Sequence, residues 1–262
     1  MLRALWTGAT GMKAQSRNVD VIANNLANVN TVGFKKQDTV FADLIYQSLK
    51  KAGTLATQGT VVPTGIEVGH GVRNVATPRR FDEGELQNTE RELDIAMQGD
   101  GFFQVDYLDG AETLYTRNGS FTLNRDGEIV TTTGHRLIPA ITVPQEAIQI
   151  NIGIDGMVTA VNQDETVEEL GQIEIAKFVN PAGLASKGDN LFGETDASGD
   201  AQTGAPGADG RGTLLQGFIE LSNANAVDEI VNMIKAQRAY ELNSRVIRTA
   251  DNMLSEVARL KT

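Results

Sequence analysis

The sequence predicts an α+β protein in which long helices at the two ends of the chain flank an inserted, mainly antiparallel β domain. Both ends carry apolar residues at alternating spacings of three and four, which is typical of helices that pair as in a coiled coil. The middle contains short apolar runs separated by Gly-containing turn dipeptides, which is typical of antiparallel strands. With 262 residues, 40% of them hydrophobic, the chain is long enough to bury a sizeable core.

The first predicted element is a helix over the N-terminal thirty residues. Large apolar residues recur in it every seven positions, at Leu5, Met12, Val19 and Leu26. Small residues occupy the alternate positions of the same stripe, which favours close helix approach. Gly8 and Gly11 each cost about 1 kcal/mol inside a helix relative to Ala, so we expect this helix to need packing partners. An ordinary amphipathic helix on a local core would show a similar stripe, but a matching stripe at the other end of the chain favours pairing of the termini.

The segment from Ala23 to Lys36 is predicted to end this helix. Its Asn residues compete with helical hydrogen bonds, and Gly33 supplies a C-terminal stop. We expect residues 1–45 to belong to a helical domain together with residues 223–262. Residues 46–67 are then predicted to form an extended arm or hairpin, because Thr and Val are frequent there and Gly53 and Gly59 are suited to bends.

Residues 68–222 are predicted to form the β domain. Dipeptides that favour hairpin turns occur four times, at Asp109-Gly110, Asn118-Gly119, Asp126-Gly127 and Asp155-Gly156. Strands are expected within Leu86 to Val105, Phe121 to Val130, Leu137 to Val143, Ile148 to Val161, Gln172 to Val179 and Leu214 to Leu221. Residues 183–212 are rich in Gly, Ala, Asp and Ser, which indicates a flexible surface loop.

The last predicted element is a helix over Ala226 to Leu260, a run without Gly or Pro. One seam of steps of three and four passes through Val246, Met253, Val257 and Leu260, and a second apolar stripe that includes Leu254 lies beside it. Because one partner helix cannot cover both stripes, we expect neighbours on two sides. The predicted assembly seam therefore consists of Leu5, Met12, Val19, Leu26, Val246, Met253, Leu254, Val257 and Leu260.

The charge distribution argues against several classes of partner. The net charge is −11, yet residues 1–46 carry +2 and residues 227–262 carry +1, so the middle of the chain carries −14. This acidity argues against a nucleic-acid partner. There is no Cys and no run of about 18 apolar residues, so neither a disulfide framework nor membrane insertion is expected. The polar residues from Thr7 to Lys13 also argue against a cleavable signal peptide.

Chemistry that would indicate an enzyme is not evident in the sequence. His70 and His135 are far apart and each adjoins a Gly, so neither frames a zinc or a catalytic triad motif. Acidic pairs such as Glu90 with Glu92, or Asp94 with Asp100, lack anything that fixes a glycosidase separation. The Asp-rich stretch from 189 to 209 lacks the ligand spacing of an EF-hand loop. We therefore expect no catalytic residues, no metal and no cofactor.

Both ends of the chain carry longer motifs that can be compared with known families. The N-terminal motif ANNLANVNTVGFK contains Asn24, Asn25, Leu26, Asn28, Gly33 and Phe34, and the C-terminal motif MIKAQRAYELNSRVIRTADNML contains Gln237, Arg238 and Tyr240. The two motifs resemble the signatures of the bacterial flagellar rod and hook proteins, in the same order and at the same ends. Matches to GDGFFQV, YTRNGSF and DGEIVT extend the resemblance across most of the chain. One departure is Asn223-Ala224-Asn225, where the family usually has Asn-Val-Asn.

The resemblance implies a structural subunit of the distal rod of the flagellar basal body. Subunits of this kind stack helically into a rigid hollow drive shaft that crosses the periplasm and transmits torque to the hook. The implied partners are other copies of the chain, the proximal rod and hook subunits, the bushing ring proteins in loose contact, and the flagellar type III export apparatus.

Two alternatives remain at this stage. A proximal rod or hook protein of the same family differs in the 46–63 segment or in the length of its β region. An acidic carbohydrate-binding or hydrolytic β domain would need a cleft with convergent carboxylates, and would leave both terminal seams unexplained.

Overall fold

The computed structural model describes residues 2–53, 55–57, 60–61, 63–107, 112–164 and 166–260. The chain divides into two compact units, which we describe separately. The first unit contains Met1–Leu26, Gln37–Pro78 and Ala226–Thr262, and the second contains Ala27–Lys36 and Arg79–Asn225. The chain thus passes between the units four times, after residues 26, 36, 78 and 225.

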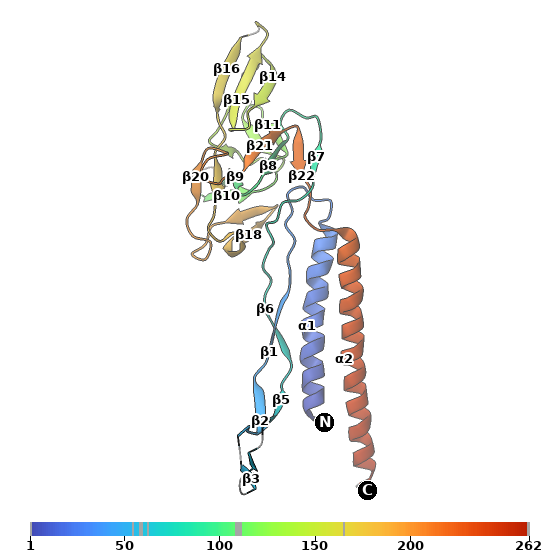
Figure 1. The fold of residues 1–262 in the computed structure, drawn as a ribbon. Helices are drawn as coiled ribbons and strands as arrows, with labels where there is room; N and C mark the ends of the chain where they lie inside the picture. The colour runs from blue at the N-terminus through green and yellow to red at the C-terminus, as the bar shows by residue number, and fades with distance from the viewer. Residues whose placement is uncertain are drawn as a thin grey trace. The chain divides into compact units, whose positions relative to one another are not determined.

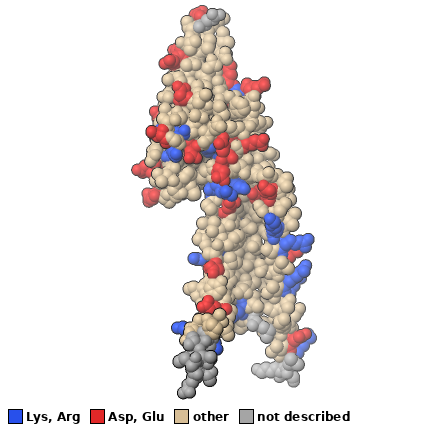
Figure 2. Space-filling view, viewed as in Figure 1, with Lys and Arg blue, Asp and Glu red and all other residues tan. Residues whose placement is uncertain are grey.

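The first unit contains the two terminal helices, α1 (Leu2–Ala27) and α2 (Ala226–Leu260), which lie side by side in Figure 1. The prediction of a helix at each end of the chain is confirmed. Asp228 and Glu229 lie in the first turn of α2 and Arg259 lies in its last turn, so these charges match the helix dipole at both ends. Figure 2 shows Lys and Arg side chains in a row along α2.

A two-stranded antiparallel ribbon belongs to the same unit. Its strands are β1 (Val40–Asp43), β2 (Tyr46–Lys50), β3 (Leu55–Thr57), β4 (Thr60–Val61), β5 (Ile66–Gly69) and β6 (Val72–Ala76). They pair as β1 with β6, β2 with β5 and β3 with β4. The described residues of the predicted arm therefore belong to this ribbon, which extends beyond residues 46–67 on both sides. Gly53 has the positive φ of 84° that its predicted bend requires, whereas Gly59 lies outside the described residues.

The second unit contains the β domain. Its strands are β7 (Leu86–Asn88), β8 (Ile95–Gln98), β9 (Phe102–Tyr107), β10 (Glu112–Thr116), β11 (Phe121–Leu123), β12 (Ile129–Thr131), β13 (Leu137–Ile138), β14 (Ala147–Ile152), β15 (Met157–Asn162), β16 (Val167–Gln172), β17 (Ile175–Lys177), β18 (Ala185–Gly188), β19 (Leu191–Gly193), β20 (Gln202–Gly204), β21 (Thr213–Gln216) and β22 (Phe218–Glu220). The larger sheet has the order β18-β19-β10-β9-β17-β20, with β13 also paired to β9, and a three-stranded sheet has the order β14-β15-β16. The described pairs are antiparallel, as predicted.

The core of the second unit lies beneath these sheets. Its fully buried side chains include Ile95, Phe103, Phe121, Leu137, Val158, Ile173 and Ile175. A second cluster is aromatic, with Phe81, Phe102, Phe178 and Phe192 in edge-to-face contacts. Figure 2 shows acidic side chains distributed over the visible face of this unit, which agrees with the negative charge that the sequence places there.

Two of the predicted turns are confirmed and one is wrong. Gly127 and Gly156 have φ values of 80° and 84°, as the predicted hairpin turns require. Asn118-Gly119 does not close a hairpin, because β10 pairs with β9 and β19, whereas β11 pairs with β12. Gly119 is required there for a different reason, since a Cβ atom on it would lie within 1.6 Å of the carbonyl oxygen of Ile95. The predicted Asp109-Gly110 turn lies outside the described residues.

The prediction of a surface loop over residues 183–212 is also wrong. This region contains β18, β19 and β20, and Leu191 and Phe192 are buried. Asp189 and Asn190, with φ values of 49° and 57°, turn the chain between β18 and β19. The low hydropathy of this segment did not indicate strands. Burial of only two apolar residues, Leu191 and Phe192, is sufficient to hold so short a hairpin in place.

Candidate assembly surface

The contact between α1 and α2 places two glycines of α1 against larger side chains of α2. A Cβ atom on Gly8 would lie 2.9 Å from Cγ1 of Ile247, and one on Gly11 would lie 2.8 Å from Nδ2 of Asn243. These separations leave no space for larger side chains. On α2 the buried residues Ala236 and Ala250 are small as well, with exposed fractions of 3% and 5%. The cost of Gly inside α1 is therefore associated with a close helix approach.

A buried polar contact lies near the C-terminal end of α1. The carboxamide of Asn25 accepts a hydrogen bond from the backbone N–H of Gln37 and donates one to its carbonyl, both at 2.9 Å. Its Nδ2 also lies 3.4 Å from Oε2 of Glu229 in the first turn of α2. Because Asn25 is only 2% exposed, its side chain pairs with Gln37 as a strand backbone would.

Other positions along α2 have the reverse character. Large apolar side chains that are 43% to 68% exposed form a stripe along it, which we call the outer stripe: Val227, Val231, Ile234, Leu242, Val246, Met253 and Val257. Soluble proteins rarely leave a continuous stripe of this kind in water. The helix pair thus packs closely at Gly8 and Gly11, while large apolar side chains of α2 remain exposed, which is unlike a self-sufficient helical hairpin.

The residues of the predicted seam fall on different surfaces. Leu5, Met12, Val19 and Leu26 are half-buried on α1, and Leu254 is half-buried on α2. Val246, Met253 and Val257 belong to the outer stripe, and the side chain of Leu260 lies outside the described residues. Sequence reasoning weighted side-chain size, whereas the contact within the chain is centred on Gly8 and Gly11, one residue away from the α1 seam.

The family-signature residues occupy several environments. Asn24 is exposed on α1, and Oδ1 of Asn28 accepts a hydrogen bond from the hydroxyl of Thr31 at 3.2 Å. Gly33 has a φ of 68°, and a Cβ atom on it would lie 2.7 Å from the backbone of Arg117. Phe34 is buried beneath the guanidinium of Arg79, 5.6 Å from the ring centroid.

The signature residues of α2 lie beside a shallow depression in the first unit. The depression has a volume of about 360 Å³ and is lined by Ser16, Val19, Asp20, Gln237, Tyr240 and Glu241. Arg238 forms an exposed ion pair with Glu241 at 3.6 Å, a contact that contributes little to stability.

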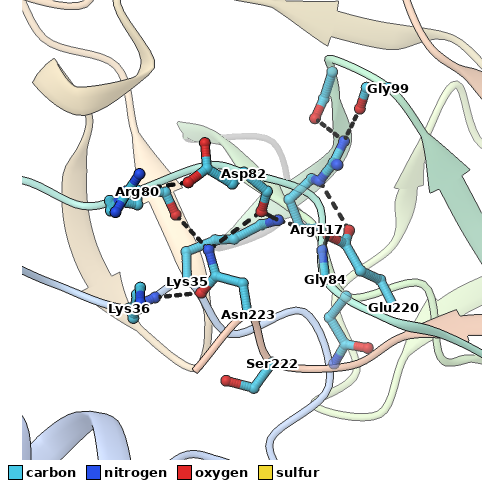
Figure 3. A network of polar contacts seen from close by, with 12 residues as sticks. Lys35, Lys36, Arg80, Asp82, Gly84, Gly99, Arg117, Glu220, Ser222 and Asn223 are labelled. Carbon is cyan, nitrogen blue, oxygen red and sulfur yellow. Dashed lines mark hydrogen bonds and ion pairs between the residues drawn. The ribbon is translucent and has the colours of Figure 1, made fainter. Parts of the chain in front are cut away.

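The second unit contains a buried ion network that the sequence did not predict (Figure 3). Nζ of Lys35 lies 2.6 Å from Oε1 of Glu220 and donates to the carbonyl of Asp82 at 2.6 Å. Nε of Arg117 lies 3.0 Å from Oε2 of Glu220, close enough for Coulombic attraction but without hydrogen-bond alignment. All three charged side chains are at most 3% exposed. Burial lowers the pKa of Lys35, and the charge of Glu220 opposes that shift.

Neighbouring backbone groups complete the network. The N–H of Gly84 donates to Oε1 of Glu220 at 2.9 Å. The carboxamide of Asn223 accepts from the N–H of Lys36 at 2.8 Å and donates to the carbonyl of Arg80 at 2.8 Å. The network therefore joins the segments 35–36, 80–84 and 220–223, which precede or follow three of the four passages of the chain between the units.

The residues considered for catalysis do not converge in the structure. His135 packs against Tyr107 with a centroid separation of 5.1 Å. The carboxylate of Asp94 accepts a hydrogen bond from the hydroxyl of Thr89 at 2.7 Å, and that of Glu92 accepts one from the N–H of Ile150 at 3.2 Å. Over the described part of the chain, no group of three or more His, Cys, Asp or Glu side chains has the arrangement of a metal site. No described helix has the length and hydropathy needed to cross a bilayer.

The chain has a helix at each end and a β domain between them in the sequence, and the outer stripe of α2 is exposed to solvent. This arrangement defines a class of structural proteins with terminal helical segments. Three family models match the sequence in the corresponding regions. "Flagella basal body rod protein" matches residues 5–35, "Flagellar hook protein FlgE/F/G D1 domain" matches 96–160, and "Flagellar basal body rod FlgEFG protein C-terminal" matches 215–260.

Relatives match over the whole length of the chain. The flagellar basal-body rod protein FlgG of Borreliella burgdorferi is 50% identical over 100% of this chain and 99% of its own length. The proteins of the same name from Caulobacter vibrioides and Bacillus subtilis are 47% and 40% identical, each over 100% of both chains. The chain therefore belongs to the flagellar basal-body rod protein family, and it is a structural component of the bacterial flagellum.

Proposed function

We propose that the chain builds the distal rod of the flagellar basal body by stacking helically with copies of itself into a rigid hollow shaft. The observation that supports this function most directly is the outer stripe of α2. Full burial of an exposed side chain of this size is worth roughly 1.5–3 kcal/mol, and because these side chains are about half exposed, each would gain about half of that. A second copy of the chain offers the same stripe and the half-buried seam of α1 as partners.

In this proposal the terminal helices form the inner tube and the β domains form its outer wall. The helices pair as in a coiled coil, within one chain through Gly8 and Gly11 and between copies through the predicted seam, in which Leu5 and Met12 of α1 face Val246 and Met253 of a neighbour. The small buried residues of α2 and its large exposed ones permit two different neighbours for α2.

The remaining partners follow from the position of such a shaft. Proximal rod subunits lie below it, hook subunits lie above it, and ring proteins surround it in loose contact as it crosses the periplasm. The chain reaches its place through the flagellar type III export apparatus. It acts through packing and not through catalysis, and it binds no nucleic acid.

The substitution Val246→Asp tests the surface on which this function depends. A charge in the outer stripe would have to be buried between copies, at a cost that association cannot offset, so we expect tube formation to be lost. Ser255→Asp introduces the same residue on another exposed face of α2 and should leave assembly unchanged. Electron microscopy and light scattering of the purified chains provide the readout. Tubes of normal appearance from Val246→Asp would show that the outer stripe is not the contact.

A further inference from the structure

The edge strands of the two largest sheets in the second unit are covered by side chains or carry charge. Within the described residues, the three-stranded sheet ends at β14 and β16, and the larger sheet ends at β18 and β20. An uncovered edge presents backbone N–H and C=O groups that can pair with an edge of another molecule. What closes each edge therefore decides how copies of this chain can associate.

The edge of β14 is covered by the carboxamide of Gln216, which extends from β21. Its Nε2 donates to the carbonyl of Ile150 at 2.6 Å, and its Oε1 accepts from the N–H of Ile152 at 3.1 Å. A residue of a parallel neighbouring strand would make the same two contacts. The carboxylate of Glu92 accepts from the N–H of Ile150 at 3.2 Å, so side chains occupy three consecutive pairing positions.

At the edge of β20, the guanidinium of Arg211 contacts the carbonyls of two successive residues, of which one points to the free edge, because successive carbonyls of a strand point to opposite sides. Its Nη2 donates to the carbonyl of Thr203 at 2.9 Å and its Nε donates to that of Gln202 at 3.3 Å. The group also lies against the backbone of Gly204, where a Cβ atom would approach its Cζ to 2.8 Å. The Arg211 side chain is only 10% exposed, so it lies along the strand and does not extend into solvent.

The other two edges carry charges and irregular register. β16 exposes Glu168 and Glu169, and its pairing with β15 is interrupted by a register shift. β18 exposes Lys187 and has a register shift of its own. Like charges on identical strands repel when two copies approach edge to edge, and bulges twist an edge away from a partner.

We propose that Gln216 and Arg211 determine the specificity of assembly by preventing the sheet edges of neighbouring copies from pairing. Water could satisfy the same backbone groups at an exposed edge, so the hydrogen bonds alone do not explain why these two long side chains are fixed along the strands. The proposal rests on the proposed function. A subunit that packs among many identical copies at close range needs sheet edges that cannot pair with those copies.

The experiment compares the full-length variants Gln216→Ala and Arg211→Ala with the unsubstituted chain. Sedimentation velocity measures association, and thioflavin T fluorescence together with the amide I infrared band measures intermolecular β structure. We expect both variants to gain intermolecular β structure and to associate at about tenfold lower concentration, since backbone groups become available at each edge. Gln149→Ala and Arg125→Ala, which alter exposed residues of the same types, should behave as the unsubstituted chain.

A second variant separates edge exposure from loss of stability. Adding Asn151→Lys to Gln216→Ala places a charge on the uncovered β14 edge and should return association to its original level, because a charged edge resists pairing. Folded variants that show no added β association would overturn the proposal. So would association that Asn151→Lys fails to reverse, since general unfolding would then be its cause. Tube formation is scored separately: if the unsubstituted chain forms no tubes while the variants still associate through β structure, the proposed function fails and the edge proposal stands.

Discussion

Nζ of Lys35 and Oε1 of Glu220 are 2.6 Å apart, although 185 residues separate them in the sequence and water reaches neither side chain. Lys35 closely follows α1, and Glu220 closely precedes α2. Their ion pair therefore fixes, inside the second unit, the two segments that lead to the terminal helices. In the proposed shaft, force between the second unit and the terminal helices would pass through these segments.

Glu220→Gln tests how much the second unit depends on this ion pair. The substitution leaves Lys35 and Arg117 as two buried cations without a compensating charge, which should lower stability by about 3–5 kcal/mol. Differential scanning calorimetry provides the measurement. Glu112→Gln is the control, because Glu112 pairs with Lys187 at 3.1 Å but both side chains are nearly half exposed. Its effect should remain below about 1 kcal/mol, and equal effects of the two substitutions would contradict the account.

The pKa of Tyr115 predicts how the stability of the second unit depends on alkaline pH. Burial raises this pKa to about 12, and the charge and hydrogen bond of Glu194 add to the shift. Because the phenol is held protonated in the folded state, its contribution to stability is complete below its unfolded pKa of about 10. That contribution is lost as the pH rises from there through the folded pKa.

Tyr115→Phe checks this dependence. The variant should lose the part of the alkaline destabilisation that begins near pH 10, so the difference in unfolding free energy between the two proteins should change between about pH 10 and pH 12. Absorbance titration of the phenolates should also lose its highest-pH component. A constant free-energy difference over this range would show that Tyr115 ionises normally.

Asn25 and Asn24 form a matched pair for the end of α1. Asn25→Ala leaves the backbone N–H and C=O of Gln37 without their partner in a buried position, which should cost about 1–3 kcal/mol. Asn24→Ala changes the adjacent, exposed residue of the same type and should cost less than Asn25→Ala, because its side chain is not buried. Hydrogen exchange at the Gln37 amide measures the difference directly, and similar exchange rates in the two variants would refute the role given to Asn25.

Periodicity was sufficient to predict the helices and the antiparallel middle of the chain. The seven-residue recurrence of Leu5, Met12, Val19 and Leu26 placed α1 correctly, and the absence of Gly and Pro from Ala226 to Leu260 placed α2. Predictions from the composition of a short segment were wrong where contacts between distant residues determine the structure. Asn118-Gly119 has the sequence of a hairpin turn, but the close approach of Ile95 explains the glycine.

The candidate site was only partly predictable, because its specificity lies in contacts between distant segments. The exposure of Val246 and Met253 follows from excess apolar width on α2, which the sequence showed. The ion network could not be found in this way, since the sequence gives no signal that Lys35, Arg117 and Glu220 meet. The edge contacts of Gln216 and Arg211 could not be predicted for the same reason. Gln and Arg are residue types that are common at ordinary surface positions.

The central claim is that copies of this chain assemble through the outer stripe of α2, and helical reconstruction of tubes by electron cryomicroscopy tests it most directly. The account predicts hollow tubes in which the terminal helices form the inner wall. In them, Val246, Met253 and Val257 would be buried against the helices of a neighbouring copy. Tubes in which these three side chains face solvent, or a purified chain that forms no tubes at high concentration, would contradict it.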